Sequence, residues 1–231
     1  MWYIIFVNLP NLKHEVPLWE KGFTVIGIDE VGRGAFAGPL VVGAVAFKPN
    51  LDKTYIQRLE NLGINDSKKL TKLQREMLAK VIRSECIAYE YGVINVTKIN
   101  KVGIGKATHM AIRKAVKNMC EKNSFGKKFL LIDAFYIKHI NGIGLKNQKG
   151  IIRGDQISIS IAAASIIAKV KRDKMMKKIS LLYPVYKFCV NKGYGTSEHR
   201  LAIQNFGASD LHRTAFVQTF LSKHKTKVAV I

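Results

Sequence analysis

Four acidic residues stand where a folded chain could bring their carboxylates together. Asp29 and Asp133 each end a short apolar run that is typical of a buried strand, and the carboxyl ends of strands often carry functional groups. Glu30 follows Asp29 directly, and Asp155 precedes a long helical pattern. Because adjacent strands lie about 4.8 Å apart, two neighbouring strand ends could share one hard divalent cation. These four acids are therefore candidate ligands of Mg²⁺ or Mn²⁺.

A pair of carboxylate-held divalent ions would supply the parts of phosphodiester hydrolysis. Two ions about 3.5–4 Å apart can activate a water molecule and stabilise the leaving oxygen, so no protein nucleophile is needed. The acids also have structural explanations. Asp155 could cap a helix, Asp29 and Asp133 could be strand-end acids paired with lysine, and Asp173 has the helical spacing of an ion pair with Lys169. Spacing alone leaves both interpretations of the four acids open.

The charge of the chain indicates a polyanionic partner. The sequence contains 38 Lys and Arg against 16 Asp and Glu, a formal net charge of +22. An excess of this size attracts polyanions, of which nucleic acid is the commonest. A lysine-rich proteome could produce a similar excess without a specific partner. Carboxylates on a surface that binds nucleic acid would repel the ligand unless metal ions intervene, which gives the four acids further interest.

The cysteines and the amino-terminal residues indicate the compartment. Cys86, Cys120 and Cys189 are odd in number and far apart, without a Cys-x-x-Cys pair, which argues against a disulfide framework or a zinc site. The apolar residues 1–7 are too few to span a bilayer and lack the basic start of a signal peptide. We therefore expect a cytoplasmic protein that does not associate with membranes.

The elements that must position the acids alternate between strands and helices. Four apolar runs are predicted to be strands: residues 23–29, 40–47, 86–94 and 128–132. Four amphipathic or alanine-rich segments are predicted to be helices: residues 71–83, 106–120, 156–178 and a segment starting near residue 197. The first two strands are the expected antiparallel pair. Such a mixture predicts the α/β class, with a mixed central sheet flanked by helices.

Local signals refine two of these helices. Thr71 and Gln74 have the spacing of a capping box at the start of the helix predicted for residues 71–83. Its apolar stripe is expected to comprise Leu70, Leu73, Met77 and Val81. In the helix of residues 156–178, the three alanines at positions 162–164 would permit close packing on a sheet.

One domain of ordinary size accounts for most of the chain. Residues 1–21 are interpreted as an N-terminal extension and residues 222–231 as a basic, flexible tail. Between them, residues 22–221 would form the domain that carries the acids, with the C-terminal helices included. Residues 138–154, rich in Gly, Lys and Asn, are predicted to be a loop.

Separated motifs, in the order that a known family has them, closely resemble ribonuclease HII. They are residues 27–34 (Gly-Ile-Asp-Glu-Val-Gly-Arg-Gly) with 37–39, residues 66–71 (Asp-Ser-Lys-Lys-Leu-Thr), residues 131–134 (Leu-Ile-Asp-Ala), residues 154–155 with 160–173, and residues 192–196 (Lys-Gly-Tyr-Gly-Thr). Any one short motif could arise by chance, but their conjunction is specific. The first seventeen or so residues and the lysine-rich tail lie outside the resemblance.

The resemblance implies a ribonuclease H-like fold and a metal-dependent endoribonuclease. Members of the family hydrolyse the RNA strand of RNA–DNA hybrids. They also incise duplex DNA on the 5′ side of a single ribonucleotide, leaving a 3′-hydroxyl and a 5′-phosphate. The resemblance further implies two Mg²⁺ or Mn²⁺ ions with substrate bound, a monomer, and a part in ribonucleotide excision during DNA replication and repair.

The resemblance also implies residue roles. The metal-binding catalytic acids would be the four already named: Asp29, Glu30, Asp133 and Asp155. The substrate-binding residues would be the family's Gly-Arg-Gly turn, its ribonucleotide-sensing tyrosine and two phosphate contacts: Gly32, Arg33, Gly34, Tyr194, Ser67 and Lys68. Glycines let peptide groups approach a ligand closely, so the turn could bond the 2′-hydroxyl that distinguishes RNA from DNA. An arginine in that turn could hold a phosphate with two hydrogen bonds.

Other interpretations remain at this point. The runner-up is a non-catalytic basic nucleic-acid-binding protein in which the acids are caps and ion pairs. A DNA-directed nuclease of the same fold, such as a resolvase, is disfavoured because it would have no 2′-hydroxyl for the glycine turn and Tyr194 to sense. The related ribonuclease HIII has Gly-Lys-Gly where this chain has Arg33. His199 and His212 are ambiguous and are left outside the catalytic set, because lone histidines are more often structural.

Overall fold

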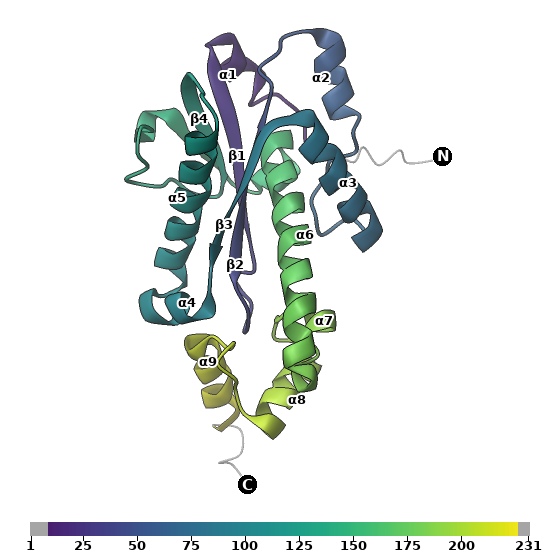
Figure 1. Cartoon of the computed structure of the whole chain (residues 1–231), viewed down its shortest axis with the longest axis vertical. Coiled ribbons are helices and arrows are strands. Elements are labelled where there is room, and N and C mark those ends of the chain that lie inside the picture. Colours follow the sequence, from purple (N-terminus) through teal and green to yellow (C-terminus); the bar gives the residue numbers. More distant parts are fainter. Residues whose placement is uncertain (1–8, 226–231) are drawn as a thin grey trace, which may run out of the picture.

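In the computed structural model, which describes residues 9–225, a five-stranded sheet lies at the centre (Figure 1). Its strands are β1 (Phe23–Val31), β2 (Leu40–Phe47), β3 (Cys86–Ile94), β4 (Lys127–Asp133) and β5 (Gln148–Ile151). Their order is β3-β2-β1-β4-β5. Strands β1, β2 and β3 are antiparallel neighbours, whereas β1, β4 and β5 run parallel. The mixed sheet and the antiparallel pairing of its first two strands are therefore confirmed.

Two long helices cover the two faces of this sheet. The helices of the described chain are α1 (Val16–Glu20), α2 (Lys53–Glu60), α3 (Lys72–Glu85), α4 (Val96–Val102), α5 (Ile104–Lys122), α6 (Ile159–Leu182), α7 (Phe188–Asn191), α8 (Ser197–Phe206) and α9 (Thr214–Lys225). Helix α5 packs on one face and α6 on the other. A short 3₁₀ turn, Gly154–Gln156, joins β5 to α6.

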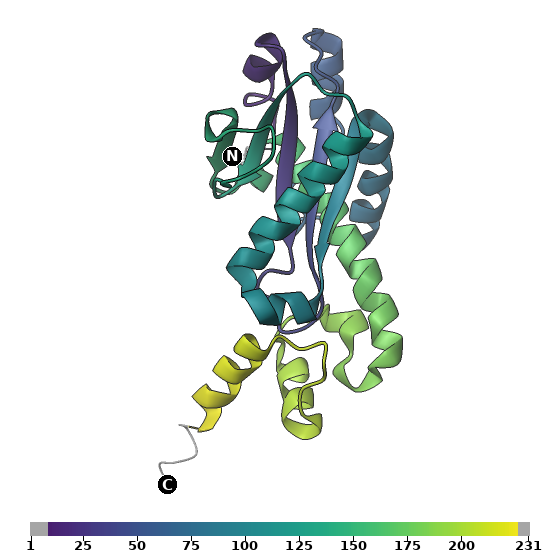
Figure 2. The same cartoon turned by 60° about the vertical axis from the view of Figure 1, so that its left-hand side comes forward.

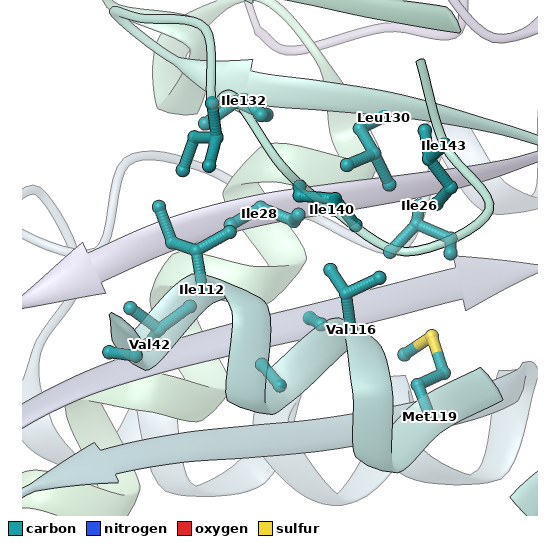
Figure 3. Packing of buried hydrophobic residues seen from close by; sticks show 14 of the residues in the cluster. Ile26, Ile28, Val42, Ile112, Val116, Met119, Leu130, Ile132, Ile140 and Ile143 are labelled. Atoms are coloured by element: carbon teal, nitrogen blue, oxygen red, sulfur yellow. The ribbon is translucent and has the colours of Figure 1, made fainter. Parts of the chain in front are cut away.

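The core divides between the two faces according to the alternation of strand side chains. On β1, Ile26 and Ile28 face α5, where they lie with Ile112 and Val116 of that helix (Figure 3). Val25 of the same strand joins the other cluster, which includes the buried side of α6. Since alternate residues of β1 take opposite faces, Gly27 and Asp29 lie on the α6 side.

Helix α6 lies very close to the sheet, as its alanines predict. Ala162, Ala163 and Ala164 are completely buried. A Cβ atom added to Gly27 of β1 would lie 2.1 Å from the carbonyl carbon of Ser160. The helix begins after Ser158, whose hydroxyl accepts a hydrogen bond from the Ile161 amide. The absence of a side chain at one strand position thus sets how closely the helix approaches.

The C-terminal helices form a smaller layer beyond the carboxyl end of β1. Helices α7, α8 and α9 gather below the sheet, around the lower end of α6, and α9 projects away from it (Figures 1 and 2). Their core contains Met176 of α6, Phe188 of α7 and Ile203 of α8. The loops between these helices therefore face the turn that follows β1.

The structure differs from the sequence predictions at several places. The stripe predicted for α3 is wrong at Leu73 and Met77, which are 68% and 59% exposed, while Ala79 and Ile82 are buried. The reason is that α3 packs on α6 and β3 through a neighbouring stripe of the same period. Leu70 packs against the core as predicted. Its capping box between Thr71 and Gln74 is confirmed. The predicted loop 138–154 contains strand β5, whose Gly and Lys residues gave no apolar pattern.

The structure describes part of each predicted terminal segment. Within the predicted extension, residues 1–8 lie outside the described residues, but α1 packs on the core and Trp19 is buried. Helix α9 runs to Lys225, so the first residues of the predicted flexible tail are helical. Residues 226–231 of that tail lie outside the described residues. None of the helices in the described chain is long and apolar enough to cross a membrane.

The contact between β1 and α6 predicts that Gly27→Ala destabilises the domain. The added methyl would overlap the helix backbone, and overpacking of this kind costs about 1–3 kcal/mol. Urea unfolding followed by circular dichroism would measure the loss. The control is Gly105→Ala in α5, where an added Cβ has open space and is expected to be neutral or slightly stabilising. Equal stability of the two variants would contradict the close approach.

Candidate active site

The parallel pairing of β1 with β4 brings two of the predicted acids side by side. Ile28 of β1 pairs with Ile132 of β4, so the next step along both strands places Asp29 beside Asp133. Asp29 is 6% exposed. The expectation that these two strands are neighbours, on which the shared cation depended, is confirmed.

Each carboxylate of this pair is held by bonds from its surroundings. Asp133 accepts a hydrogen bond of 2.7 Å from the amide of Gly154, at the turn before α6. Asp29 accepts one of 2.7 Å from the amide of Glu30 and another from the side chain of Ser165 on α6. Both side chains are therefore oriented by groups on the α6 side of the sheet.

Asp155 approaches the pair from the turn between β5 and α6. It is buried and lies in the 3₁₀ turn, three residues before Ser158, the actual cap of α6. The structural explanation that Asp155 caps the helix is therefore wrong. One of its oxygens lies 3.5 Å from the ammonium of Lys68, which is otherwise exposed to solvent.

The electrostatics show that these acids act on one another. Burial, and then the negative charge of Glu30, raise the pKa of Asp29 well above its usual value, and Asp133 and Asp155 add to the shift. Burial also raises the pKa of Glu30, against the opposing effect of Arg33. Like charges in a poorly solvated place disfavour ionisation. The four acids thus form one electrostatic cluster.

A second pair of shifts joins Asp66 to this cluster. Burial, and then the charge of Asp66, raise the pKa of Asp155. Asp66 is buried and accepts hydrogen bonds from the Lys68 amide and the Gln156 side chain. Burial works against the charge of Lys68, but Asp155, Asp66 and Asp29 together raise its pKa. Lys68 is therefore held positively charged at the edge of the acids.

The acids open into a pocket of about 460 Å³. Its lining contains most of the residues predicted as site residues: Asp29, Glu30, Asp133, Gly32, Arg33, Ser67, Lys68 and Tyr194. Val31, Ser165 and Lys169 complete the lining. Two predicted residues lie outside it. Asp155 acts through its charge, and Gly34 stands in the same turn with open space around its Cα.

Two buried arginines hold the glycine turn and the residues 37–39 that follow it. Arg172 of α6 donates hydrogen bonds to the carbonyls of Pro39, Ala37 and Lys192. Arg213 donates to the carbonyls of Arg33 and Gly38. Gly32 has φ +91°, and a Cβ there would lie 2.1 Å from Nε of Arg172. Only glycine fits at this position, for both its conformation and its space.

Backbone hydrogen bonds connect residues 36–37, just after the glycine turn, to the loop that carries Tyr194. The carbonyl of Gly193 accepts hydrogen bonds from the amides of Phe36 and Ala37. Tyr194 is half-buried, and its ring centroid lies 5.2 Å from the Arg172 guanidinium and 5.8 Å from the Lys169 ammonium. Lys169 also forms the predicted ion pair with Asp173, at 2.9 Å. Tyr194 thus lines the same pocket as the acids.

The prediction from sequence missed five residues that build this site: Asp66, Ser165, Lys169, Arg172 and Arg213. Ser165 and Lys169 are four residues apart and hence on one face of α6, a spacing that could have singled them out. Asp66 begins a motif that was recognised. Ser165, Lys169 and Arg172 also lie within a recognised motif, residues 160–173. Nothing local to Arg213 distinguishes it from the other basic residues, since its partners are distant in sequence.

The donor set fits a hard divalent cation. Within the described chain, no group of three or more histidine, cysteine or acidic side chains forms a complete metal site as it stands. Such a cage is not required, because Mg²⁺ is commonly bound by one or two carboxylates together with water and substrate phosphate oxygens. The buried position of Asp29 and the nearby charges of Glu30, Asp133 and Asp155 both raise its pKa, and a cation bound among these oxygen donors would relieve that repulsion.

Comparison with known proteins settles the family. The sequence model of ribonuclease HII matches residues 26–219. The chain belongs to the ribonuclease HII family. Ribonuclease HII of Clostridioides difficile (strain 630) is 43% identical over 204 residues, which are 88% of this chain and 74% of that protein. The match is to ribonuclease HII, in agreement with the arginine in the glycine turn.

Solved structures agree on the fold. Ribonuclease H2 from Pyrococcus horikoshii OT3 is similar with a TM-score of 0.65 and 21% identity, over 88% of this chain and 99% of that chain. Bst-RNase HIII in complex with Mn²⁺ is similar with a TM-score of 0.64 and 20% identity, over 88% of this chain and 71% of that chain. The predicted ribonuclease H-like fold is confirmed.

Membership of the ribonuclease HII family makes this protein a metal-dependent hydrolase of the ribonuclease H type. The prediction of an enzyme is confirmed, and the non-catalytic nucleic-acid-binding protein is set aside.

The crowding of acids predicts that Asp29→Asn stabilises the metal-free protein. Because burial in the folded protein raises the pKa of Asp29 well above its ordinary value, the native state binds the proton more tightly than the unfolded chain. The free energy of unfolding therefore falls as the pH rises from the pKa of Asp29 in the unfolded chain to its higher pKa in the folded protein. The variant lacks this loss, so its melting temperature in a chelating buffer at neutral pH should be a few degrees higher.

The gain from Asp29→Asn should shrink at acid pH, where the wild-type carboxyl is protonated in both states. Asp52→Asn is the matched control, because asparagine caps α2 as well as aspartate does, and its melting temperature should not change. A lower melting temperature for Asp29→Asn at neutral pH would contradict the electrostatic cluster.

Proposed function

We propose that the protein is an endoribonuclease that hydrolyses the RNA strand of RNA–DNA hybrids and incises duplex DNA on the 5′ side of a single ribonucleotide. The products are a 3′-hydroxyl and a 5′-phosphate. The observation that carries the proposal is one shared pocket. It joins the acids Asp29 and Asp133 to the glycine turn and to Tyr194. A group that recognises a ribose thereby lies beside groups suited to hydrolysis.

Asp29, Glu30, Asp133 and Asp155 are the residues that would hold the metal. Mg²⁺ or Mn²⁺ would supply an activated water and stabilisation of the leaving oxygen, with two ions present when substrate is bound. The Mn²⁺ complex of Bst-RNase HIII supports a divalent ion in a protein of this fold. The hydrogen bonds to Asp29 and Asp133 orient their oxygens toward the pocket before any ligand arrives.

The basic residues around the pocket would bind the nucleic-acid backbone. The Arg33 guanidinium lies 3.4 Å from Glu30 and its side chain is 50% exposed, so a phosphate can take it as a second partner. Lys68 extends into solvent from beside Asp155. The Ser67 hydroxyl lies 3.0 Å from the hydroxyl of Ser165 on α6. These groups mark the path of the cleaved strand past the acids.

The glycine turn and Tyr194 would test the sugar. The peptide groups of Gly32, Arg33 and Gly34 can come within hydrogen-bond distance of a 2′-hydroxyl because no side chain shields the glycines. Tyr194 offers a flat face and a phenolic hydroxyl to the sugar at an RNA-to-DNA junction. A DNA-directed nuclease would have no use for this arrangement.

Residues 22–221 form the proposed working unit of this enzyme, acting as a monomer on hybrid or ribonucleotide-containing duplexes. The described part of the N-terminal extension supports that unit through a contact with α6. Glu15 is buried and accepts hydrogen bonds from the amide and hydroxyl of Ser160 and from the hydroxyl of Ser158. The extension therefore steadies the amino-terminal end of the helix that carries Ser165 and Lys169.

An incision assay tests the activity directly. A DNA duplex with one embedded ribonucleotide should be cut on its 5′ side when Mg²⁺ or Mn²⁺ is present, and not in a chelating buffer. Mass spectrometry should find 3′-hydroxyl and 5′-phosphate ends. Asp133→Asn should lower the rate by more than about 100-fold, beyond the loss usual for residues that only support a ligand. Asp52→Asn serves as the matched control and should retain the wild-type rate.

Cleavage of an all-DNA duplex at a similar rate would sink the ribonucleotide specificity. Undiminished turnover by Asp133→Asn would remove the acids from the mechanism. Either result leaves the family assignment intact, because that depends on sequence alone.

Tyr194→Ala should selectively impair the single-ribonucleotide substrate. We expect its rate on that duplex, relative to its rate on an RNA–DNA hybrid, to fall about tenfold, equivalent to about 1.4 kcal/mol. The reason is that a continuous RNA strand offers a 2′-hydroxyl at every position, so no junction needs to be found. Tyr194→Phe separates the contribution of the hydroxyl from that of the ring. An equal loss on both substrates would deny the tyrosine its role as a junction sensor.

A further inference from the structure

Two buried histidines that the proposed mechanism leaves without a role lie directly behind Tyr194. His199, in the first turn of α8, and His212, in the segment before α9, are 0% and 2% exposed. Their Nε2 atoms are 3.0 Å apart. Nδ1 of His199 lies 2.9 Å from the carbonyl oxygen of Tyr194. The pair therefore ends on the backbone of the proposed ribonucleotide sensor.

The hydrogen bonds fix the tautomer of each ring. The backbone amide of Ser209 donates to Nδ1 of His212 at 2.9 Å, so this nitrogen carries no proton. Neutral His212 must then carry its proton on Nε2 and donate it to Nε2 of His199. His199 in turn carries its proton on Nδ1 and donates it to the Tyr194 carbonyl. Only one arrangement of protons satisfies all three bonds.

The surroundings keep both rings uncharged. The pair is enclosed by the aromatic rings of Phe36, Tyr186 and Phe188. Burial lowers the pKa of His199, and burial together with the neighbouring histidine lowers the pKa of His212 to about 4. The nearby carboxylate of Asp210 opposes this effect only weakly. At neutral pH the chain of hydrogen bonds is therefore intact.

The segment that carries His212 is itself bonded to residues 36–38, which directly follow the glycine turn. The amide of Arg213 donates to the Phe36 carbonyl at 2.7 Å, and the amide of Gly38 donates to the Leu211 carbonyl at 3.0 Å. Ala37 pairs with His212 in an isolated β-bridge. The two histidines thus link the position of the Tyr194 backbone to the turn that would bond the 2′-hydroxyl.

We propose that the His199–His212 pair positions Tyr194 relative to the glycine turn and thereby determines how well the enzyme recognises a single ribonucleotide. The inference rests on the proposed function, since it assigns a support to the sensor named there. Both histidines are buried and neither lines the pocket, so they are positioning residues. They act through the carbonyl of Tyr194 and the segment 209–213.

The test is a double-mutant cycle between His199→Phe and Tyr194→Ala. Phenylalanine keeps the aromatic packing but removes both hydrogen bonds of the ring. The readout is the rate on a single-ribonucleotide duplex divided by the rate on an RNA–DNA hybrid, which does not depend on the fraction of active enzyme. We expect His199→Phe to lower this ratio about fivefold or more and to have no further effect when Tyr194 is already alanine. Additive effects of the two substitutions would overturn the proposal.

Two further variants separate positioning from simple structural support. Phe188→Leu loosens the packing on both histidines but leaves their hydrogen bonds, so it should lower the melting temperature without changing the ratio. His199→Asn keeps a side-chain N–H that can reach the Tyr194 carbonyl, so its ratio should lie closer to wild type than that of His199→Phe. Equal ratios for the asparagine and phenylalanine variants would contradict a role for this bond.

A measurement on the wild-type protein covers the case in which His199→Phe does not fold. Nitrogen-15 NMR of the histidine rings at neutral pH should find the proton on Nδ1 of His199 and on Nε2 of His212. The opposite tautomers, or a doubly protonated ring, would overturn the proposal. A wild-type enzyme that does not cut the single-ribonucleotide duplex would instead defeat the proposed function, and a Tyr194 effect without a His199 effect would defeat only this inference.

Discussion

The repulsion among carboxylates at the ends of two parallel strands is the constraint on which the rest of the site depends. Asp29 and Asp133 are neighbours because β1 and β4 pair in register, and Glu30 and Asp155 add their charges to the same place. Burial makes this repulsion stronger than it would be in water. The sheet and α6 hold these carboxylates together despite their repulsion. A divalent cation bound among them would offset that repulsion.

Positive charge is buried beneath the glycine turn. Arg172 and Arg213 lie there, and within the described part of the chain neither guanidinium forms an ion pair with a carboxylate. Backbone carbonyls accept the hydrogen bonds of both guanidinium groups instead. Burial, and then the charge of Arg172, lower the pKa of Arg213 to about 9. The turn is thus rigidly bonded and set on a positive base, which suits a surface that meets a polyanion.

These two features divide the work of the pocket. In the proposed function, the acids would determine where a phosphodiester is hydrolysed, and the glycine turn with the Tyr194 loop would determine which sugar is accepted there. One layer of the domain is the sheet together with α6, and the other is formed by the C-terminal helices. Helix α6, which carries Arg172, contributes to the cores of both layers.

The sequence by itself determined the features whose cause is local. Alternating and continuous apolar runs predicted the strands and placed Asp133 at the end of β4, although β1 continues past Asp29 to Val31. The spacing of Thr71 and Gln74 predicted a helix cap. The tertiary structure alone decided which stripe of α3 is buried and that Ser158, rather than Asp155, caps α6. It also decided that Arg172, Arg213 and the two histidines support the site. The partners of the two arginines include residues up to 180 positions away, and no local pattern encodes contacts that exist only once separate layers have packed together.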